Sequence, residues 1–166
     1  MIIILMGVTG CGKTTIGQQL ARELNWPFYD GDDFHPAANV EKMRAGIPLT
    51  DDDRAPWLAT LQNLIREKLN TSQSGILACS ALKQKYRDWL QVDPLKVRFV
   101  FLQGDFATIA KRLAARTNHY MDPNLLASQF EALEEPRDAL AVDIAQTPGA
   151  IVAHIRSALQ LPKQVV

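Results

Sequence analysis

The strongest constraint on this chain is a glycine-rich loop that directly follows an apolar N-terminal run. Residues 2–6 are continuously apolar and rich in β-branched side chains, which is typical of a strand buried on both faces of a sheet. The next eight residues, 7–14, read Gly-Val-Thr-Gly-Cys-Gly-Lys-Thr and fit the pattern G-x-x-x-x-G-K-[ST]. From residue 14 to residue 24, apolar side chains recur at helical spacing. Strand, loop and helix in this order predict an α/β fold with a phosphate-binding loop.

The residue types in this loop each suit a nucleotide triphosphate. Glycines let backbone N–H groups curl around phosphate oxygens, and the start of the helix adds a positive dipole. Lys13 is expected to reach the β- and γ-phosphates, and the Thr14 hydroxyl is expected to bind Mg²⁺. A glycine turn with an incidental lysine is the alternative, but the position between a buried strand and a helix disfavours it. The predicted ATP contacts are Gly7, Val8, Thr9, Gly10, Cys11, Gly12, Lys13, Thr14 and Thr15.

The rest of the chain alternates strand-like and helical patterns. Short apolar runs at 27–29, 76–79, 97–102 and 140–144 predict four further strands, and helical periodicity at 57–69, 106–115 and 150–159 separates them. Such alternation implies right-handed crossovers and an open parallel sheet with helices on both faces. Its 166 residues suit one domain. Ligands of such sheets bind beyond the carboxyl ends of the strands, so residues that follow different strands are expected to converge there.

Composition excludes several classes of function. Lys plus Arg equals Asp plus Glu at 18 each, so no overall basic field exists to attract nucleic acid or an acidic membrane. Two cysteines are too few for a disulfide framework and follow no metal-ligand spacing. The apolar run at 2–6 is too short for a membrane span and lacks the basic flank of a signal peptide. We therefore expect a cytoplasmic protein that binds small anions through a local cluster.

Two polar stretches interrupt the alternation. Residues 33–50 are punctuated by prolines and are too long for a simple strand-to-helix connection, so we expect a substrate-side flap that continues through the next helix to about residue 70. Residues 116–124 form a shorter polar excursion between two helices and are expected to act as a lid.

A pair of carboxylates follows the second predicted strand, next to the phosphate-binding loop. Asp30 is expected to hold water ligands of Mg²⁺, while Asp32 accepts a hydrogen bond from the hydroxyl of an acceptor. The alternative is that both residues only cap the segment that follows.

Basic residues at the same edge are candidates for substrate contacts. Arg54 lies in the first turn of a helix beside the flap, where a guanidinium can clamp a carboxylate or phosphoryl group. Asp51 and Asp52 open this helix, and favourable interaction with its dipole explains them. Lys83 and Arg87 follow the third strand; for Arg87 a solvated helix face is the alternative.

The lid and its flanks supply further candidates. Arg112 and Arg116 lie four residues apart on one helical face and suit the phosphates of ATP at closure, with surface charge as the alternative. His35 in the flap and His119 in the lid lack the partners of a zinc site, so hydrogen bonds to substrate are the expectation.

A phosphate-binding loop leaves the class of reaction open, and other features must narrow it. The chain has no N-K-x-D motif of a switch GTPase, and no apolar strand ends in the Asp-Glu pair typical of ring-forming ATPases. The carboxylate pair favours a small-molecule kinase. A kinase for shikimate or nucleotides, or a nucleotide-binding sensor without chemistry, remain alternatives.

Motifs along most of the chain resemble the gluconokinase family of P-loop kinases, relatives of shikimate and adenylate kinases. The matching segments are the loop at 7–14, Asp30-Gly31-Asp32, His35-Pro36, Asn39, Lys42-Met43, Gly46, Pro48-Leu49, 51–54, Pro56-Trp57-Leu58, 79–83, Tyr86-Arg87, Arg112-Leu113, Arg116, His119, Met121, Ser128-Gln129-Phe130, Leu133-Glu134 and Pro136.

The resemblance implies a P-loop kinase three-layer fold with a five-stranded parallel sheet in the order 2-3-1-4-5. It implies transfer of the ATP γ-phosphate to the 6-hydroxyl of D-gluconate, as part of sugar-acid and pentose phosphate metabolism, and often a homodimer. By similarity to shikimate kinase, Asp30 would lie in the outer shell of Mg²⁺ and Asp32 would orient the acceptor hydroxyl. Arg54 would contact substrate and Arg116 would close over ATP.

Overall fold

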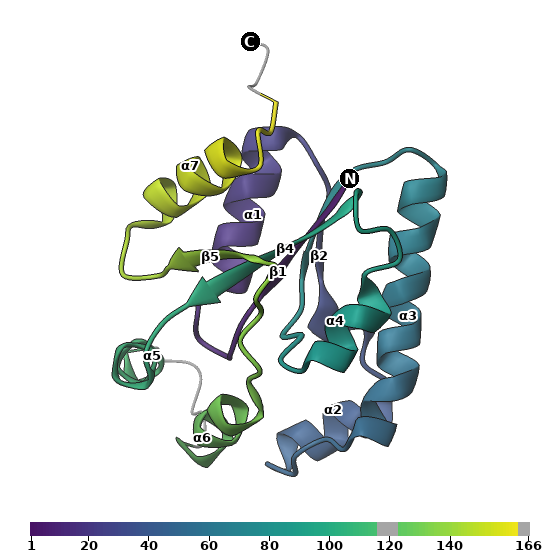
Figure 1. Cartoon of the computed structure of the whole chain (residues 1–166). Helices are drawn as coiled ribbons and strands as arrows, with labels where there is room; N and C mark the ends of the chain where they lie inside the picture. Colours follow the sequence, from purple (N-terminus) through teal and green to yellow (C-terminus); the bar gives the residue numbers. More distant parts are fainter. Residues whose placement is uncertain (116–122, 163–166) are drawn as a thin grey trace.

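A computed structural model of the chain describes residues 1–115 and 123–162. Five parallel strands form one sheet in the order β2-β3-β1-β4-β5 (Figure 1). Their bounds are β1 (Ile2–Met6), β2 (Phe28–Asp30), β3 (Gly75–Ala78), β4 (Val97–Gln103) and β5 (Leu140–Asp143). The predicted sheet order is confirmed, and the ends of every strand lie within one residue of the prediction. The strand β2 extends to Asp30, which still pairs with Ala78 of β3.

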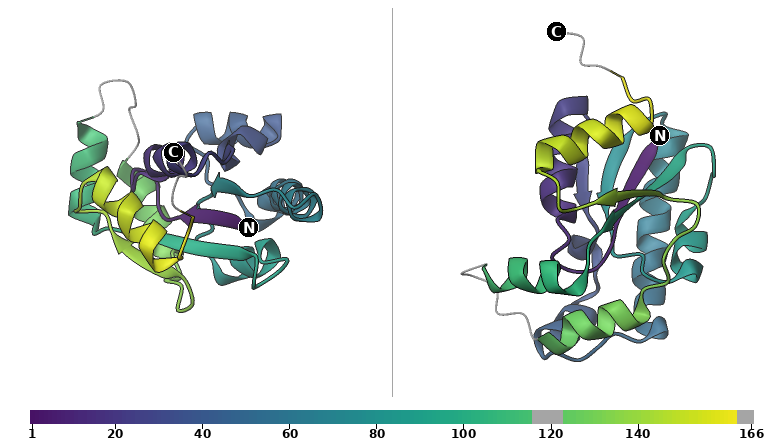
Figure 2. Two further views of the ribbon diagram at one scale, coloured as in Figure 1. Left: turned by 90° about the horizontal axis from the view of Figure 1, so that it is seen from above. Right: turned by 60° about the vertical axis from the view of Figure 1, so that its left-hand side comes forward.

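Helices cover both faces of the sheet (Figure 2). Their bounds are α1 (Lys13–Leu24), α2 (Ala37–Arg44), α3 (Asp51–Asn70), α4 (Gln84–Leu90), α5 (Phe106–Ala114), α6 (Pro123–Ala132) and α7 (Pro148–Ala158), with a 3₁₀ turn at Gly31–Phe34. The helix α2 and the 3₁₀ turn lie in the flap region, where periodicity alone predicts no regular structure. In the described part of the chain, no helix combines the length and the apolar composition that a membrane span requires.

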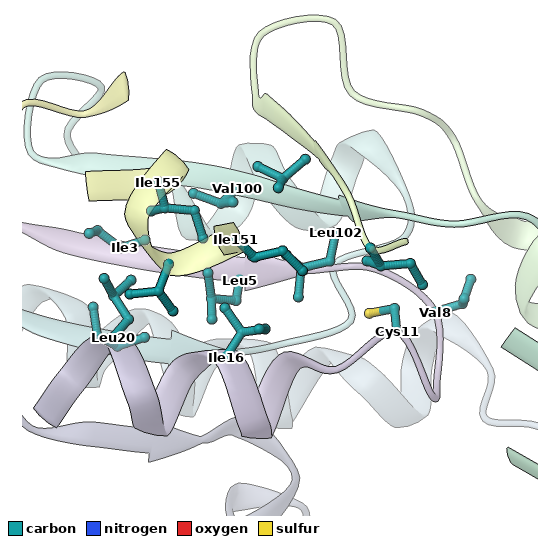
Figure 3. Packing of buried hydrophobic residues seen from close by; sticks show 14 of the residues in the cluster. Ile3, Leu5, Val8, Cys11, Ile16, Leu20, Val100, Leu102, Ile151 and Ile155 are labelled. Atoms are coloured by element: carbon teal, nitrogen blue, oxygen red, sulfur yellow. The ribbon is translucent and has the colours of Figure 1, made fainter. Parts of the chain in front are cut away.

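The central strand β1 is apolar throughout because both of its faces are covered. Ile3 and Leu5 pack with α1 and α7, as Figure 3 shows, whereas Ile4 and Met6 point the other way and pack with α3 and α4. No residue of β1 is more than 3% exposed. Alternation of side chains across a strand therefore produces two hydrophobic clusters, one on each face.

The carboxyl ends of the strands meet at one edge of the sheet, and α2 and α6 lie beyond this edge in the lower part of Figure 1. The backbone N–H of Gly7, just after β1, donates to the carbonyl of Ser80, just after β3, at 3.2 Å. Loops that are distant in sequence are therefore joined at this edge, as parallel-sheet geometry requires.

Candidate active site

The phosphate-binding loop leads into α1 without a side-chain cap. Gly12 is the N-cap residue with φ of 103°, a left-handed conformation that favours glycine, and the first turn contains no acidic residue. The N–H groups at the start of α1 are thus left for an external anion. Val8 and Cys11 anchor the loop in the core, and Cys11 is only 1% exposed. This burial favours the role of a small filler for its thiol over that of a reactive group.

The Lys13 side chain folds back onto the phosphate-binding loop. Its ammonium donates to the carbonyls of Gly7 and Val8, each at 2.9 Å. The Nζ atom is therefore held against the carbonyls of the loop.

The carboxylate pair lies directly beside the loop, as the sequence predicts. The Thr14 hydroxyl donates to Oδ2 of Asp30 at 3.0 Å, and Oδ1 of Asp30 accepts from the backbone N–H of Asp32 at 3.2 Å. Asp30 therefore caps the 3₁₀ turn, as one alternative proposes, and also contacts the loop. Gly31 allows this arrangement because a Cβ there would lie 2.5 Å from the carbonyl oxygen of Ala78.

Asp32 carries the exposed carboxylate of the site. Its side chain is 82% exposed, yet the protein around it removes enough water to raise its pKa. The carboxylate of Asp30 raises the pKa further, whereas Lys13 acts in the opposite direction. Two carboxylates and a threonine hydroxyl thus gather where a cation would relieve their repulsion.

These oxygen donors fit Mg²⁺ better than a zinc-type site. Magnesium prefers oxygen ligands and retains waters, and the Thr14 hydroxyl and the Asp30 carboxylate already lie within hydrogen-bonding distance of each other. Within residues 1–115 and 123–162, no three His, Cys, Asp or Glu side chains cluster as metal ligands. A magnesium ion here would draw its remaining ligands from phosphate and water.

The start of α3 forms the acceptor side of the edge. Thr50 and Asp53 make a reciprocal capping box, which explains why the helix begins at Asp51. The ammonium of Lys42, from α2, donates to Asp53 at 2.7 Å. Lys42 and the backbone N–H of Thr50 lower the pKa of Asp53 to about 2. This contact ties α2 to α3, so the flap is a folded unit.

Arg54 projects from the first turn of α3 and is oriented by its neighbours. Its Nη1 donates to the carbonyl of Leu49 at 2.5 Å, and its guanidinium lies 5.7 Å from the centre of the Tyr86 ring. The Tyr86 hydroxyl in turn donates to Asp51. Tyr86, from α4, thus links both ends of this first turn.

Asp51 does more than complement the helix dipole. Its carboxylate accepts from Lys83 at 3.1 Å and from Lys85 at 2.5 Å, in addition to the Tyr86 hydroxyl. Hydrogen bonds from Lys85, Tyr86 and Lys83 lower the pKa of Asp51. Lys83 therefore lies at the predicted edge, but in this structure it is paired with the flap.

The sequence predicts that Arg87 either contacts substrate or lies on a solvated helix face, and the structure instead buries it. The residue is 2% exposed, so the alternative of a solvated helix face is wrong. Its Nη1 donates to the carbonyls of Ala81 and Leu82 at 3.0 Å, and its Nη2 donates to Gln84. The buried guanidinium thus shapes the loop that presents Lys83, a geometry that favours an indirect role over substrate contact.

The lid side of the edge is described only in part. Arg112, near the end of α5, donates to the carbonyl of Ile144 at 2.5 Å, which fixes it beside the loop after β5. Arg116 and His119 lie outside the described residues, as does most of the predicted lid.

Three further residues, for which the sequence predicts no role, lie near this edge of the sheet. Gln129 of α6 accepts from the backbone N–H of Thr9, Asn39 of α2 is buried beside His35, and the Trp57 ring stacks on His35 with centroids 4.3 Å apart. All three belong to the segments that carry the family resemblance, which is the signal that could have singled them out.

Comparison with known proteins agrees with this geometry. The family model described as shikimate kinase matches residues 9–158. The thermosensitive gluconokinase of Escherichia coli K12 is 43% identical over 165 residues, which cover 97% of this chain and 88% of that relative. The gluconokinase of Gluconobacter oxydans is 47% identical over 136 residues, which cover 82% and 76%.

A solved structure extends the similarity to three dimensions. The crystal structure of a gluconokinase from Sinorhizobium meliloti has a TM-score of 0.83 and 41% identity, covering 95% of this chain and 94% of that one. The fold and the site define a P-loop kinase. The chain belongs to the gluconokinase family, within the wider group that the shikimate kinase model describes.

Proposed function

We propose that this protein is a gluconokinase, which transfers the γ-phosphate of ATP to the 6-hydroxyl of D-gluconate and releases 6-phospho-D-gluconate and ADP. The observation that carries the proposal is the hydrogen bond between Thr14 and Asp30, because it joins the phosphate-binding loop to the turn that presents Asp32. Relatives that are 40–47% identical and are named gluconokinase support the acceptor.

The proposed mechanism relies on positioning and on neutralisation of charge. The loop N–H groups hold the phosphates of ATP, and Lys13 exchanges its carbonyl partners for β- and γ-phosphate oxygens. Thr14, and Asp30 through water, would hold Mg²⁺, which would supply positive charge against the phosphate oxygens. Asp32 accepts a hydrogen bond from the 6-hydroxyl and orients it in line with the γ-phosphate. A strong base is unnecessary if the transition state is loose.

The acceptor is proposed to lie between the flap and the loop after β3. Arg54 and Lys83 offer positive charge to the gluconate carboxylate, and their present partners are a backbone carbonyl and the Asp51 carboxylate. Arg112 is assigned to the phosphates of ATP, Arg116 to closure over ATP and His119 to a hydrogen bond with substrate; the family resemblance supports the role of Arg116.

The deciding experiment measures ADP release with D-gluconate, related aldonates, shikimate and nucleoside monophosphates as separate acceptors. We expect gluconate to be preferred, with 6-phosphogluconate identified by phosphorus NMR. Activity with shikimate or a nucleotide and none with gluconate would contradict the proposed acceptor. Binding of ATP without ADP release for any acceptor would favour the sensor alternative.

A Lys13→Ala variant tests the nucleotide site separately. Loss of the ammonium removes the charge nearest the γ-phosphate, so turnover should fall to background while the fold, followed by circular dichroism, is retained. Turnover close to that of the unmodified protein would remove Lys13 from the mechanism.

The homodimer and the cytoplasmic location are further proposals. The family resemblance supports the first, and the absence of a net basic field together with the sugar-acid substrate supports the second. Light scattering coupled to gel filtration would report the number of subunits directly.

A further inference from the structure

A buried asparagine in the flap fixes the orientation of its own amide. Asn39 is 4% exposed, and its Nδ2 donates to the backbone carbonyl of Asp53 at 2.7 Å. A carbonyl oxygen can only accept, so the nitrogen of the amide must face Asp53. The same nitrogen lies 3.4 Å from Nδ1 of His35 and has a second hydrogen to offer.

This arrangement selects one tautomer of His35. Because Asn39 donates to Nδ1, that ring nitrogen must accept, and the single proton of a neutral imidazole lies on Nε2. Burial, together with the nearby Arg54 guanidinium, lowers the pKa of His35 to about 4, which keeps the ring neutral near pH 7.

The His35 ring is also held in place by stacking. It lies parallel to the Trp57 ring, with centroids 4.3 Å apart and an interplanar angle of 13°. Trp57 is itself fixed, because its Nε1 donates to the carbonyl of Gly31 at 2.7 Å. Gly31 belongs to the turn that carries Asp32, so the flap and this turn share one rigid contact.

The free end of the imidazole faces the Asp32 carboxylate. Nε2 lies 4.0 Å from Oδ1 of Asp32, beyond the range of a hydrogen bond. The His35 side chain is 5% exposed and fixed, whereas the Asp32 side chain is 82% exposed and can rotate. Hydrogen bonds at active sites are often long before substrate binds and shorten in the complex.

We infer that His35 is a positioning residue, whose Nε2–H holds the Asp32 carboxylate toward the acceptor hydroxyl, and that Asn39 sets the tautomer required for this. The inference rests on the proposed function. It differs from the direct substrate contact that the sequence predicts for His35, because a ring with a 5% exposed side chain has little surface to offer a substrate.

Two substitutions of His35 separate the effect of hydrogen-bond donation by Nε2–H from the effect of ring stacking on Trp57. His35→Phe keeps an aromatic ring to stack on Trp57 but has no donor, whereas His35→Gln loses the ring but can place an amide N–H near the position of Nε2. Misplacement of a reacting group by about 1 Å costs on the order of 100-fold in rate. We therefore expect kcat to fall about 100-fold in His35→Phe and less than about tenfold in His35→Gln.

The Michaelis constants distinguish positioning from binding. Both variants should keep KM for ATP and for gluconate within about threefold of the unmodified protein, because Asp32 orientation affects the transition state rather than ground-state binding. His154→Phe and His154→Gln, on the exposed side of α7, are matched controls and should leave kcat unchanged. Activity of His35→Phe equal to or above that of His35→Gln would overturn the inference.

A measurement without turnover keeps the inference distinct from the proposed function. Long-range nitrogen–proton NMR spectra report which nitrogen of each imidazole is protonated, and the chain has three histidines, so His35→Gln assigns the signal. We expect the neutral Nε2–H tautomer in the unmodified protein and a mixture of tautomers in Asn39→Ala. A neutral Nδ1–H tautomer or a charged ring at pH 7 would overturn the inference, whereas absence of gluconate phosphorylation would contradict only the proposed function.

Discussion

The side-chain oxygen of Gln129 accepts a hydrogen bond from the backbone N–H of Thr9 at 2.6 Å, across 120 residues of sequence. Thr9 lies in the phosphate-binding loop, and Gln129 lies in α6, the helix that follows the predicted lid. Just beyond α6, Glu134 accepts from the backbone N–H of Gln84 at 2.5 Å and donates its own N–H to Leu82 at 2.9 Å. The segment that follows the predicted lid is thus fastened to the loops after β1 and β3.

Replacing Gln129 tests whether this contact shapes the nucleotide site. In Gln129→Ala the Thr9 N–H loses its partner, and a lost hydrogen bond of about 1 kcal/mol should raise KM for ATP about fivefold. KM for gluconate should change less than twofold. Glu131→Gln, an exposed position on the same helix, is the control. An unaltered KM for ATP would show that the loop keeps its shape without Gln129.

Replacing Asp32 tests its proposed role toward the acceptor. Asp32→Asn keeps the size of the side chain but removes its charge and the second acceptor oxygen, so kcat should fall about 100-fold or more. Affinity for ATP, measured by calorimetry, should stay within about threefold, since within residues 1–115 and 123–162 the carboxylate that is hydrogen-bonded to Thr14 belongs to Asp30 and not to Asp32. Asp33→Asn, the exposed neighbour, should behave like the unmodified protein. Near-normal turnover of Asp32→Asn would exclude the role.

The first two residues of α3, Asp51 and Asp52, provide a matched pair of substitutions. Asp51→Asn and Asp52→Asn remove the same charge from the same helix dipole, but only Asp51 accepts from Lys83, Lys85 and Tyr86. We expect KM for gluconate to rise several-fold in Asp51→Asn alone, because Lys83 and Tyr86 lose their common anchor.

Stability should respond little to either change. Exposed ion pairs contribute little to stability because water and salt screen them, so the unfolding temperatures of the two variants should be similar. Equal values of KM for gluconate in the two variants would mean that the contacts of Asp51 do not orient the acceptor site.

The buried imidazole of His35 should make stability depend on pH. Its pKa is about 4 in the folded protein and about 6.5 when unfolded, so the unfolded chain binds more protons between these values. His35 should therefore cost about 2 kcal/mol of stability on going from about pH 7.5 to about pH 5. Urea unfolding of the unmodified protein and His35→Phe at both pH values measures this difference.

The expected result is a smaller loss of stability in His35→Phe over that interval. Asp53 does not interfere, because its pKa is lowered to about 2 and its contribution is lost only below about pH 4. Identical losses in the two proteins would mean that His35 titrates normally in the folded state.

The local pattern of apolar residues was sufficient to predict much of the fold. A run of apolar residues at 2–6 needs cover on both sides, and the structure provides it with α1 and α7 on one face and α3 and α4 on the other. The helix α2 escaped prediction because it is short and only half apolar, and it is stabilised by contacts to α3 such as that between Lys42 and Asp53.

The candidate site was predicted less completely, because residue type reports chemistry but not partners. Arg87 looks like any basic residue on a helix, and only its position over the carbonyls of Ala81 and Leu82 shows that it is buried. Asp51 likewise fits the helix dipole in sequence, and its three donors come from α4 and the residue before it, more than 30 residues later.

The glycine loop, its lysine and the carboxylates at 30 and 32 were sufficient by themselves to predict a nucleotide site and to favour phosphorylation of a small acceptor, because backbone conformation and charge are local properties. Tertiary structure alone decided how these groups are held. The stacking of His35 on Trp57, the hydrogen bond from the Asn39 amide to the Asp53 carbonyl and the contact between Gln129 and Thr9 each join segments that only the packed sheet and helices bring together. Such contacts depend on distances across the fold, which the order of residues along the chain does not contain.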